Sequence, residues 1–170
     1  MPLSPEDLII VARITYRSAL WISYSDDDGG RSAQAQESAV LKRSIQTLQR
    51  KTRVGSDERK ILELAIAKTD LWHEWSVDLI GVIEDIQKHI EKISPSMRMI
   101  IMEIAKNVAT AFEERSWLSS MRVRMVAGVR NKFTKMRPKM TPKQISSISD
   151  CEMSALRELA KALGVSNFLG

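Results

Sequence analysis

Residues 23–38 read SYSDDDGGRSAQAQES, and this stretch decides how the first half of the chain folds. The three aspartates at 26–28 oppose helix propagation, and the glycine pair at 29–30 permits the positive φ angles that a turn requires. Strongly helical patterns lie on both sides. We therefore predict an acidic loop that closes a hairpin of two helices.

Signals for the starts of helices recur along the chain. Ser4-Pro5 offers a capping hydroxyl and a proline at the first helical position, and Ser94-Pro95 repeats this pair. Ser56 provides a third cap after a glycine turn. Apolar residues at steps of three and four follow each start, so these positions predict amphipathic helices.

The region from Asp57 to Ile93 contains no proline and only one glycine, Gly81. One helix of this length would be unusual in a compact domain. We expect a break between Lys68 and Asp70, with Asp70 capping a second helix that continues to Ile93.

The predicted fold is an all-α, single-domain bundle of about six to eight helices over residues 1–170. The broad apolar helices that start at Ser4 and Ser94 are expected at its centre. A final helix from Asp150 should stop at Gly164. The repeated helix starts also allow two pseudo-symmetric halves, although similar helix signals alone would produce the same pattern.

Composition fits a folded chain in a reducing compartment. Hydrophobic residues make up 44% and charged residues 28% of the 170 residues, which is typical of globular proteins. Cys151 is the single cysteine, so an intrachain disulfide is excluded. No apolar run approaches the roughly 20 residues of a transmembrane helix. We expect a cytoplasmic protein without a transmembrane segment.

A basic segment at 115–148 is inserted in the second half. Residues 116–148 contain eight Lys/Arg and no Asp/Glu, so with a net charge of +5 the remainder carries −3. The segment could contact nucleic acid through Arg122, Arg124, Arg130, Lys132 and Lys135. Between Arg122 and Lys143 the only aromatic residue is Phe133, which gives little support to base stacking. Alternatively, these cations bind the acidic remainder or a partner protein.

The acidic loop contains part of an EF-hand pattern. Counted from Asp26, Asp28 is third and Glu37 is twelfth, the positions of hard oxygen ligands. Gly30 and Arg31 occupy the fifth and sixth positions, where an oxygen ligand and a glycine are usual. This pattern predicts at most a weak site for Ca²⁺, Mg²⁺ or Mn²⁺. The alternative is an acidic cluster that stabilises the dipole of the following helix.

Signatures of catalysis are missing from the sequence. It has no GxSxG elbow, no GxxxxGK phosphate loop and no GxGxxG dinucleotide motif. His73 and His89 are sixteen residues apart, which does not match a helical zinc motif. We therefore expect a non-enzymatic protein.

Three pieces of the chain belong together: the helix that runs into Asp28-Gly29, Glu37 after that loop, and the terminal helix with Glu152 and Leu163-Gly164. In these pieces the chain resembles the TerB-like, tellurite-resistance-associated helical proteins. The resemblance implies an all-α fold with internal pseudo-symmetry and a role in tellurite or metal-ion stress. It also implies divalent-cation binding on an acidic surface and non-enzymatic contacts with other proteins. The second half departs from the family because residues 116–148 replace its Asp-Gly loop.

Overall fold

The fold is described by a computed structural model that covers residues 3–25, 32–110, 148 and 150–169, with the backbone alone for 32–37. Within these residues seven helices pack together and no strand is present, which confirms the predicted all-α bundle. None of the helices in this part of the chain has the length and apolarity needed to cross a membrane.

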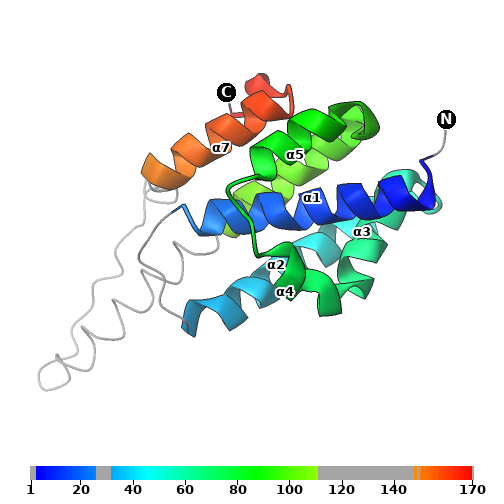
Figure 1. The fold of residues 1–170 in the computed structure, drawn as a ribbon, viewed down its shortest axis with the longest axis horizontal. Coiled ribbons are helices and arrows are strands. Elements are labelled where there is room, and N and C mark those ends of the chain that lie inside the picture. The colour runs from blue at the N-terminus through cyan, green and yellow to red at the C-terminus, as the bar shows by residue number, and fades with distance from the viewer. Residues whose placement is uncertain (1–2, 26–31, 111–147, 149, 170) are drawn as a thin grey trace, which may run out of the picture.

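The helices follow one another in chain order (Figure 1). They are α1 (Pro5–Ser23), α2 (Ser32–Lys51), α3 (Asp57–Ala67), the 3-10 turn η1 (Thr69–Leu71), α4 (Trp72–Trp75), α5 (Val82–His89), the 3-10 turn η2 (Ile90–Lys92), a helix that is described over residues 95–110, α7 (Asp150–Ala162) and the 3-10 turn η4 (Ser166–Leu169).

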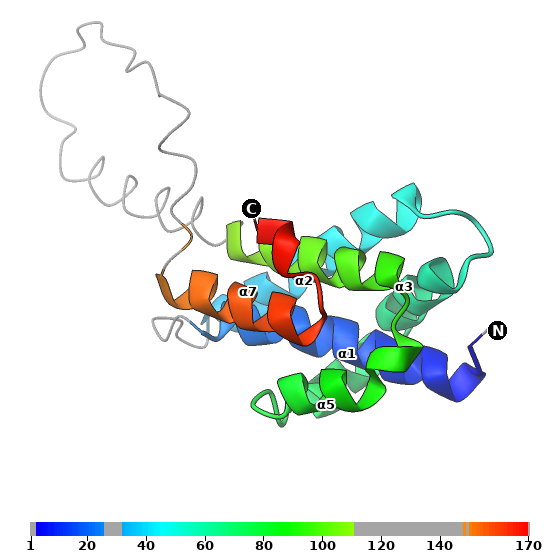
Figure 2. The ribbon, with the colours of Figure 1, turned by 90° about the horizontal axis from the view of Figure 1, so that it is seen from above.

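Helix α1 lies at the centre of the bundle. It packs against α2, α3, α4, α5 and α7, and Figure 2 shows α7 running alongside it. Val11, Ile14 and Ile22 have no exposed surface, so α1 is buried on more than one side. The helix over 95–110 also contributes a broad buried face, which includes Met97 and Ile101. Both helices thus have the broad apolar surface that their sequences predict.

The predicted helix caps are confirmed by hydrogen bonds. The hydroxyls of Ser4, Ser56 and Ser94 each accept a hydrogen bond from the backbone N–H three residues later, at 3.1, 3.2 and 3.1 Å. The predicted stop after α7 is also present, because Gly164 has a φ of +68°. These N-caps and the C-terminal turn satisfy backbone groups that a helix end would otherwise leave without a partner.

The prediction for residues 70–93 is wrong in two respects. The break after α3 is present at Lys68, but Asp70 lies inside η1 and does not cap a helix. The helix does not continue to Ile93, because residues 76–81 form a loop between α4 and α5. Ser76 donates a hydrogen bond to the carbonyl of His73 at 2.7 Å, and Asp78 accepts one from the N–H of Gly81 at 3.4 Å. Such local side-chain bonds compete with helical hydrogen bonding.

Candidate functional site

The predicted ligand and contact residues lie largely outside the described part of the chain. Asp26 and Asp28 fall in the undescribed stretch 26–31, and Glu37 is described only by its backbone in α2. The undescribed stretch 111–147 contains the basic residues Arg122, Arg124, Arg130, Lys132 and Lys135. The cation site and the nucleic-acid surface therefore stay predictions. Among the described residues, no cluster of three or more His, Cys, Asp or Glu side chains could hold a metal ion.

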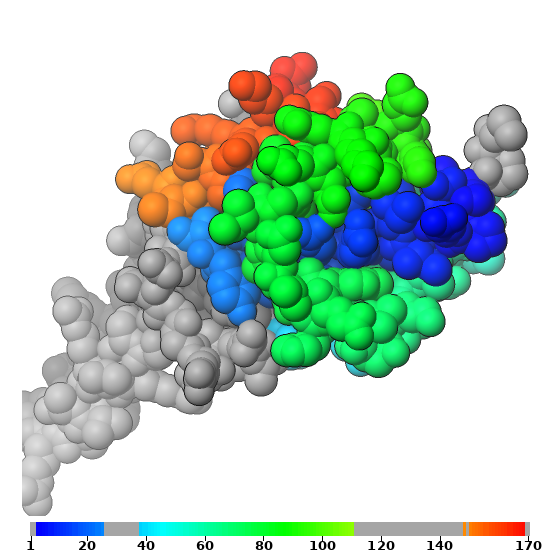
Figure 3. Space-filling view, viewed as in Figure 1, coloured from blue at the N-terminus to red at the C-terminus, as the bar shows by residue number. Residues whose placement is uncertain are grey.

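The described surface has a distinct apolar feature at the loop between α4 and α5, residues 76–81, which we call the α4–α5 loop. Val77 is 78% exposed and Ile80 is 90% exposed. Among the described large hydrophobic residues only Val54, also at 78%, is comparably exposed. In Figure 3 the segment from α4 to α5 forms a green band across the middle of the molecule, over the blue α1. The loop therefore presents apolar side chains on a prominent face.

An aromatic cluster fixes the helix that precedes the loop. Tyr16 of α1 packs against Trp72 and Trp75 of α4, with ring centroids 4.7 and 5.9 Å apart. The indole N–H of Trp72 donates a hydrogen bond to the carbonyl of Ala65 at 2.9 Å. Both tryptophans are buried. Their polar and apolar contacts hold α4 against α1 and α3.

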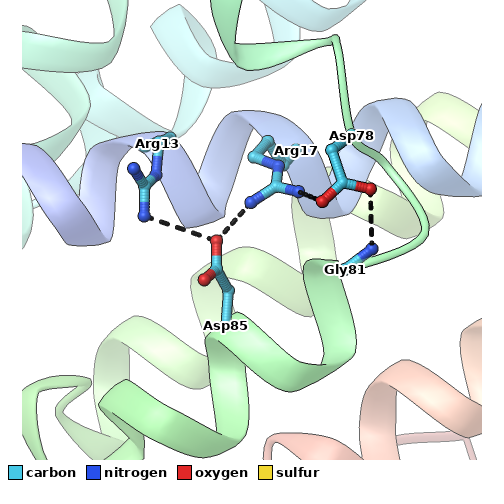
Figure 4. A network of polar contacts seen from close by, with 5 residues as sticks. All are labelled: Arg13, Arg17, Asp78, Gly81 and Asp85. Carbon is cyan, nitrogen blue, oxygen red and sulfur yellow. Dashed lines mark hydrogen bonds and ion pairs between the residues drawn. The ribbon is translucent and has the colours of Figure 1, made fainter.

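Ion pairs hold the helix that follows the loop, and a longer contact reaches the loop itself (Figure 4). The guanidinium of Arg17, whose side chain is only 8% exposed, donates a hydrogen bond to the Asp85 carboxylate and lies 4.0 Å from a carboxylate oxygen of Asp78. Arg13, one helical turn earlier, donates to the same Asp85 oxygen at 3.4 Å. Two arginines of α1 thus converge on one carboxylate of α5, and one of them also approaches the loop.

Gly81 allows the loop to close tightly. A Cβ at this position would lie 2.8 Å from a carboxylate oxygen of Asp78, which is closer than real Cβ contacts. The absence of a side chain lets the Asp78 carboxylate accept from the N–H of Gly81 while it faces Arg17. A side chain at Gly81 would therefore require the exposed Asp78 carboxylate to move from this position.

Adjacent residues of α1 hold both sides of the α4–α5 loop. Tyr16 contacts α4 before the loop, and Arg17 contacts Asp78 within it and Asp85 after it. Both contacts come from one buried helix, so the two ends of the loop that carries Val77 and Ile80 are tied to the same element.

The sequence does not identify this loop as a site. In the sequence, Val77 and Ile80 are not distinguished from the other apolar residues of a region that contains no proline. The available signal was the spacing of Asp78 and Gly81, an Asp followed three residues later by a glycine, which is common at turns. The pairing of Arg17 with Asp85 spans 68 residues of sequence and has no local signature.

A second polar cluster joins α3 to the helix over 95–110. The carboxylate of Glu58 accepts hydrogen bonds from the hydroxyls of Ser96 and Ser94, the latter at 2.8 Å. The Ser96 hydroxyl lowers the pKa of Glu58 below its usual value, against the opposing effect of partial burial, and Ser94 adds to the lowering. This cluster connects two helices through a charged group that stays ionised at neutral pH.

The residues of the TerB-like resemblance that the structure describes lie near α7. Glu152 is 3% exposed on α7, Leu163 has no exposed surface, and Gly164 forms the turn that ends the helix. Asp28 and Gly29, the first-half residues of the resemblance, are in the undescribed stretch 26–31. Comparison of this chain with protein-family models, with curated proteins and with solved structures finds no match.

Proposed function

We propose that this chain is a non-enzymatic protein-binding module that contacts its partners through the α4–α5 loop. The observation that carries the proposal is the exposure of Val77 and Ile80 on a loop whose two flanking helices are held by buried residues of α1. Exposed apolar residues that are clustered, rather than scattered singly, are typical of interaction surfaces. Burying one large aliphatic side chain at an interface stabilises a complex by about 1.5–3 kcal/mol.

The proposal includes the biological setting implied by the TerB-like resemblance. We propose a cytoplasmic role in tellurite or metal-ion stress, with weak binding of a divalent cation at Asp26, Asp28 and Glu37. The support for this part is the partial EF-hand spacing and the resemblance, together with the single cysteine. Cation binding and partner binding would use different parts of the chain, so each can be tested alone.

The test of partner binding uses exposed valines as matched controls. The full-length chain is expressed in cells with an affinity tag, as wild type, as Val77→Asp/Ile80→Asp and as Val54→Asp. Val54 and Val77 are both 78% exposed, so neither substitution disturbs the core. We expect proteins that co-purify with wild type and with Val54→Asp but are lost from the loop variant. Identical sets of bound proteins for all three chains would overturn the proposal.

A further inference from the structure

We infer that the α4–α5 loop and the carboxylates around it bind a cationic polypeptide segment with apolar side chains, supplied by a partner protein. This inference rests on the proposed function and names the chemistry of the partner. It combines the exposed apolar side chains of the loop with the charge of the surrounding sequence.

The charge around the loop is strongly one-sided. Residues 69–87 contain five Asp/Glu and no Lys/Arg, whereas the whole chain has a net charge of +5. Asp85 is neutralised by the two arginines of α1, and Asp78 lies near one of them. Asp70, Glu74 and Glu84 are exposed and form no ion pair with any residue that the structure describes.

The acidic and apolar side chains are neighbours along one path. Helical winding continues past α4, because the N–H of Ser76 bonds to the carbonyl of Trp72 at 3.1 Å and that of Val77 to the carbonyl of Glu74 at 3.3 Å. Glu74 lies within this winding, whereas Asp70 precedes it in the 3-10 turn η1, four residues earlier in the sequence. Val77 follows Glu74 by three residues and is therefore its neighbour on the surface.

A mixed surface of this kind selects its partner by two requirements. Unpaired carboxylates attract Lys or Arg and repel an acidic segment, which gives specificity and raises the rate of encounter. Val77 and Ile80 contribute favourably to the free energy of binding only if apolar atoms of the partner cover them. A segment with cations alone would satisfy one requirement, as would a segment with apolar side chains alone.

The test measures binding of synthetic peptides to the full-length chain by isothermal titration calorimetry, at low and at physiological salt. The three peptides alternate Lys with Leu, Lys with Ser, and Glu with Leu, at equal length and with blocked ends. We expect the Lys/Leu peptide to bind about tenfold or more tightly than either other peptide. Its affinity should fall as salt rises, because exposed charges are screened.

Variants locate the binding site. We expect binding of the Lys/Leu peptide to weaken about tenfold in each of two variants, Asp70→Asn/Glu74→Gln and Val77→Ser/Ile80→Ser. The controls Val54→Ser and Glu103→Gln change exposed residues outside the segment and should leave the affinity unchanged. Equal binding by the loop variants and wild type would place the peptide elsewhere and overturn the inference.

Two further outcomes would separate this inference from the proposed function. If the loop variants lose cellular partners but no peptide preference is found, the proposed function stands and the cationic chemistry is wrong. Sedimentation of the chain without any partner tests whether a second copy of the same chain occupies the surface. Salt-sensitive self-association that is lost in both loop variants would show that another copy of this chain binds the surface, and it would overturn the inference of a separate partner protein.

Discussion

Replacing Asp85 by Asn should destabilise the fold far more than replacing Asp78 by Asn. Both carboxylates face Arg17, whose side chain is only 8% exposed. The Asp85 side chain is 23% exposed and bonds directly to that guanidinium, whereas Asp78 is 76% exposed and lies 4.0 Å away. Loss of Asp85 therefore leaves a buried cation without its main partner, while loss of Asp78 removes a weak contact at the surface.

The expected magnitudes follow from this difference in burial. Removing one partner of a buried ion pair costs about 3–5 kcal/mol. Because Asp85 is partly exposed and Asn can still accept a hydrogen bond, we expect a loss of about 2–3 kcal/mol for Asp85→Asn. For a chain of 170 residues this lowers the melting temperature by about 5–10 °C. Asp78→Asn should cost less than about 1 kcal/mol.

The stabilities of both variants are measured under the same conditions by thermal and urea unfolding, with circular dichroism as the signal. A third chain, Arg17→Met/Asp85→Leu, removes the buried cation together with its partner and should be more stable than Asp85→Asn, because the cation that then lacks Asp85, Arg13, has a side chain that is 38% exposed. Equal destabilisation by Asp85→Asn and Asp78→Asn would refute the reasoning from burial. So would a double variant that is less stable than Asp85→Asn.

Three other predictions concern the helix ends and the acidic loop. Gly164→Ala should cost about 1 kcal/mol in thermal unfolding because φ is +68°, and Gly164→Asn should cost less, since Asn tolerates this conformation. Ser96→Ala should lower stability at neutral pH. The lowered pKa of Glu58 makes its carboxylate stabilising above the unfolded value of about 4.3. This contribution is lost as the pH falls through the folded pKa, so urea midpoints of variant and wild type should approach each other at acidic pH. Ca²⁺, Mg²⁺ or Mn²⁺ should raise the melting temperature of wild type but not of Asp26→Asn/Asp28→Asn, and no rise with any ion would leave the acidic loop as a turn.

The sequence predicts those parts of the fold that depend on neighbouring residues. The caps at Ser4, Ser56 and Ser94 are confirmed because an N-cap hydroxyl and the N–H that it binds are three residues apart. The turn at Gly164 is equally local. Helical periodicity also identifies α1 as a broadly buried element, since its apolar residues cover more than one face.

The candidate site could not be predicted because its determinants are distant in sequence. The interruption at residues 76–81 lies between α4, which Tyr16 contacts, and α5, which Arg17 contacts through Asp85, 68 residues away in the sequence. In the sequence, Val77 and Ile80 belong to a pattern that a continuous helix would also produce. Only the tertiary arrangement separates them from their buried neighbours Trp75 and Val82.

The central place of α1 has a consequence for biosynthesis. This helix is made more than a hundred residues before α7, yet the two helices pack against each other. Until α7 is made, the surface of α1 that packs against it stays uncovered. Contacts of such long sequence separation slow folding. Completion of the fold is therefore expected to follow translation of α7, and nascent chains should need protection from aggregation until then.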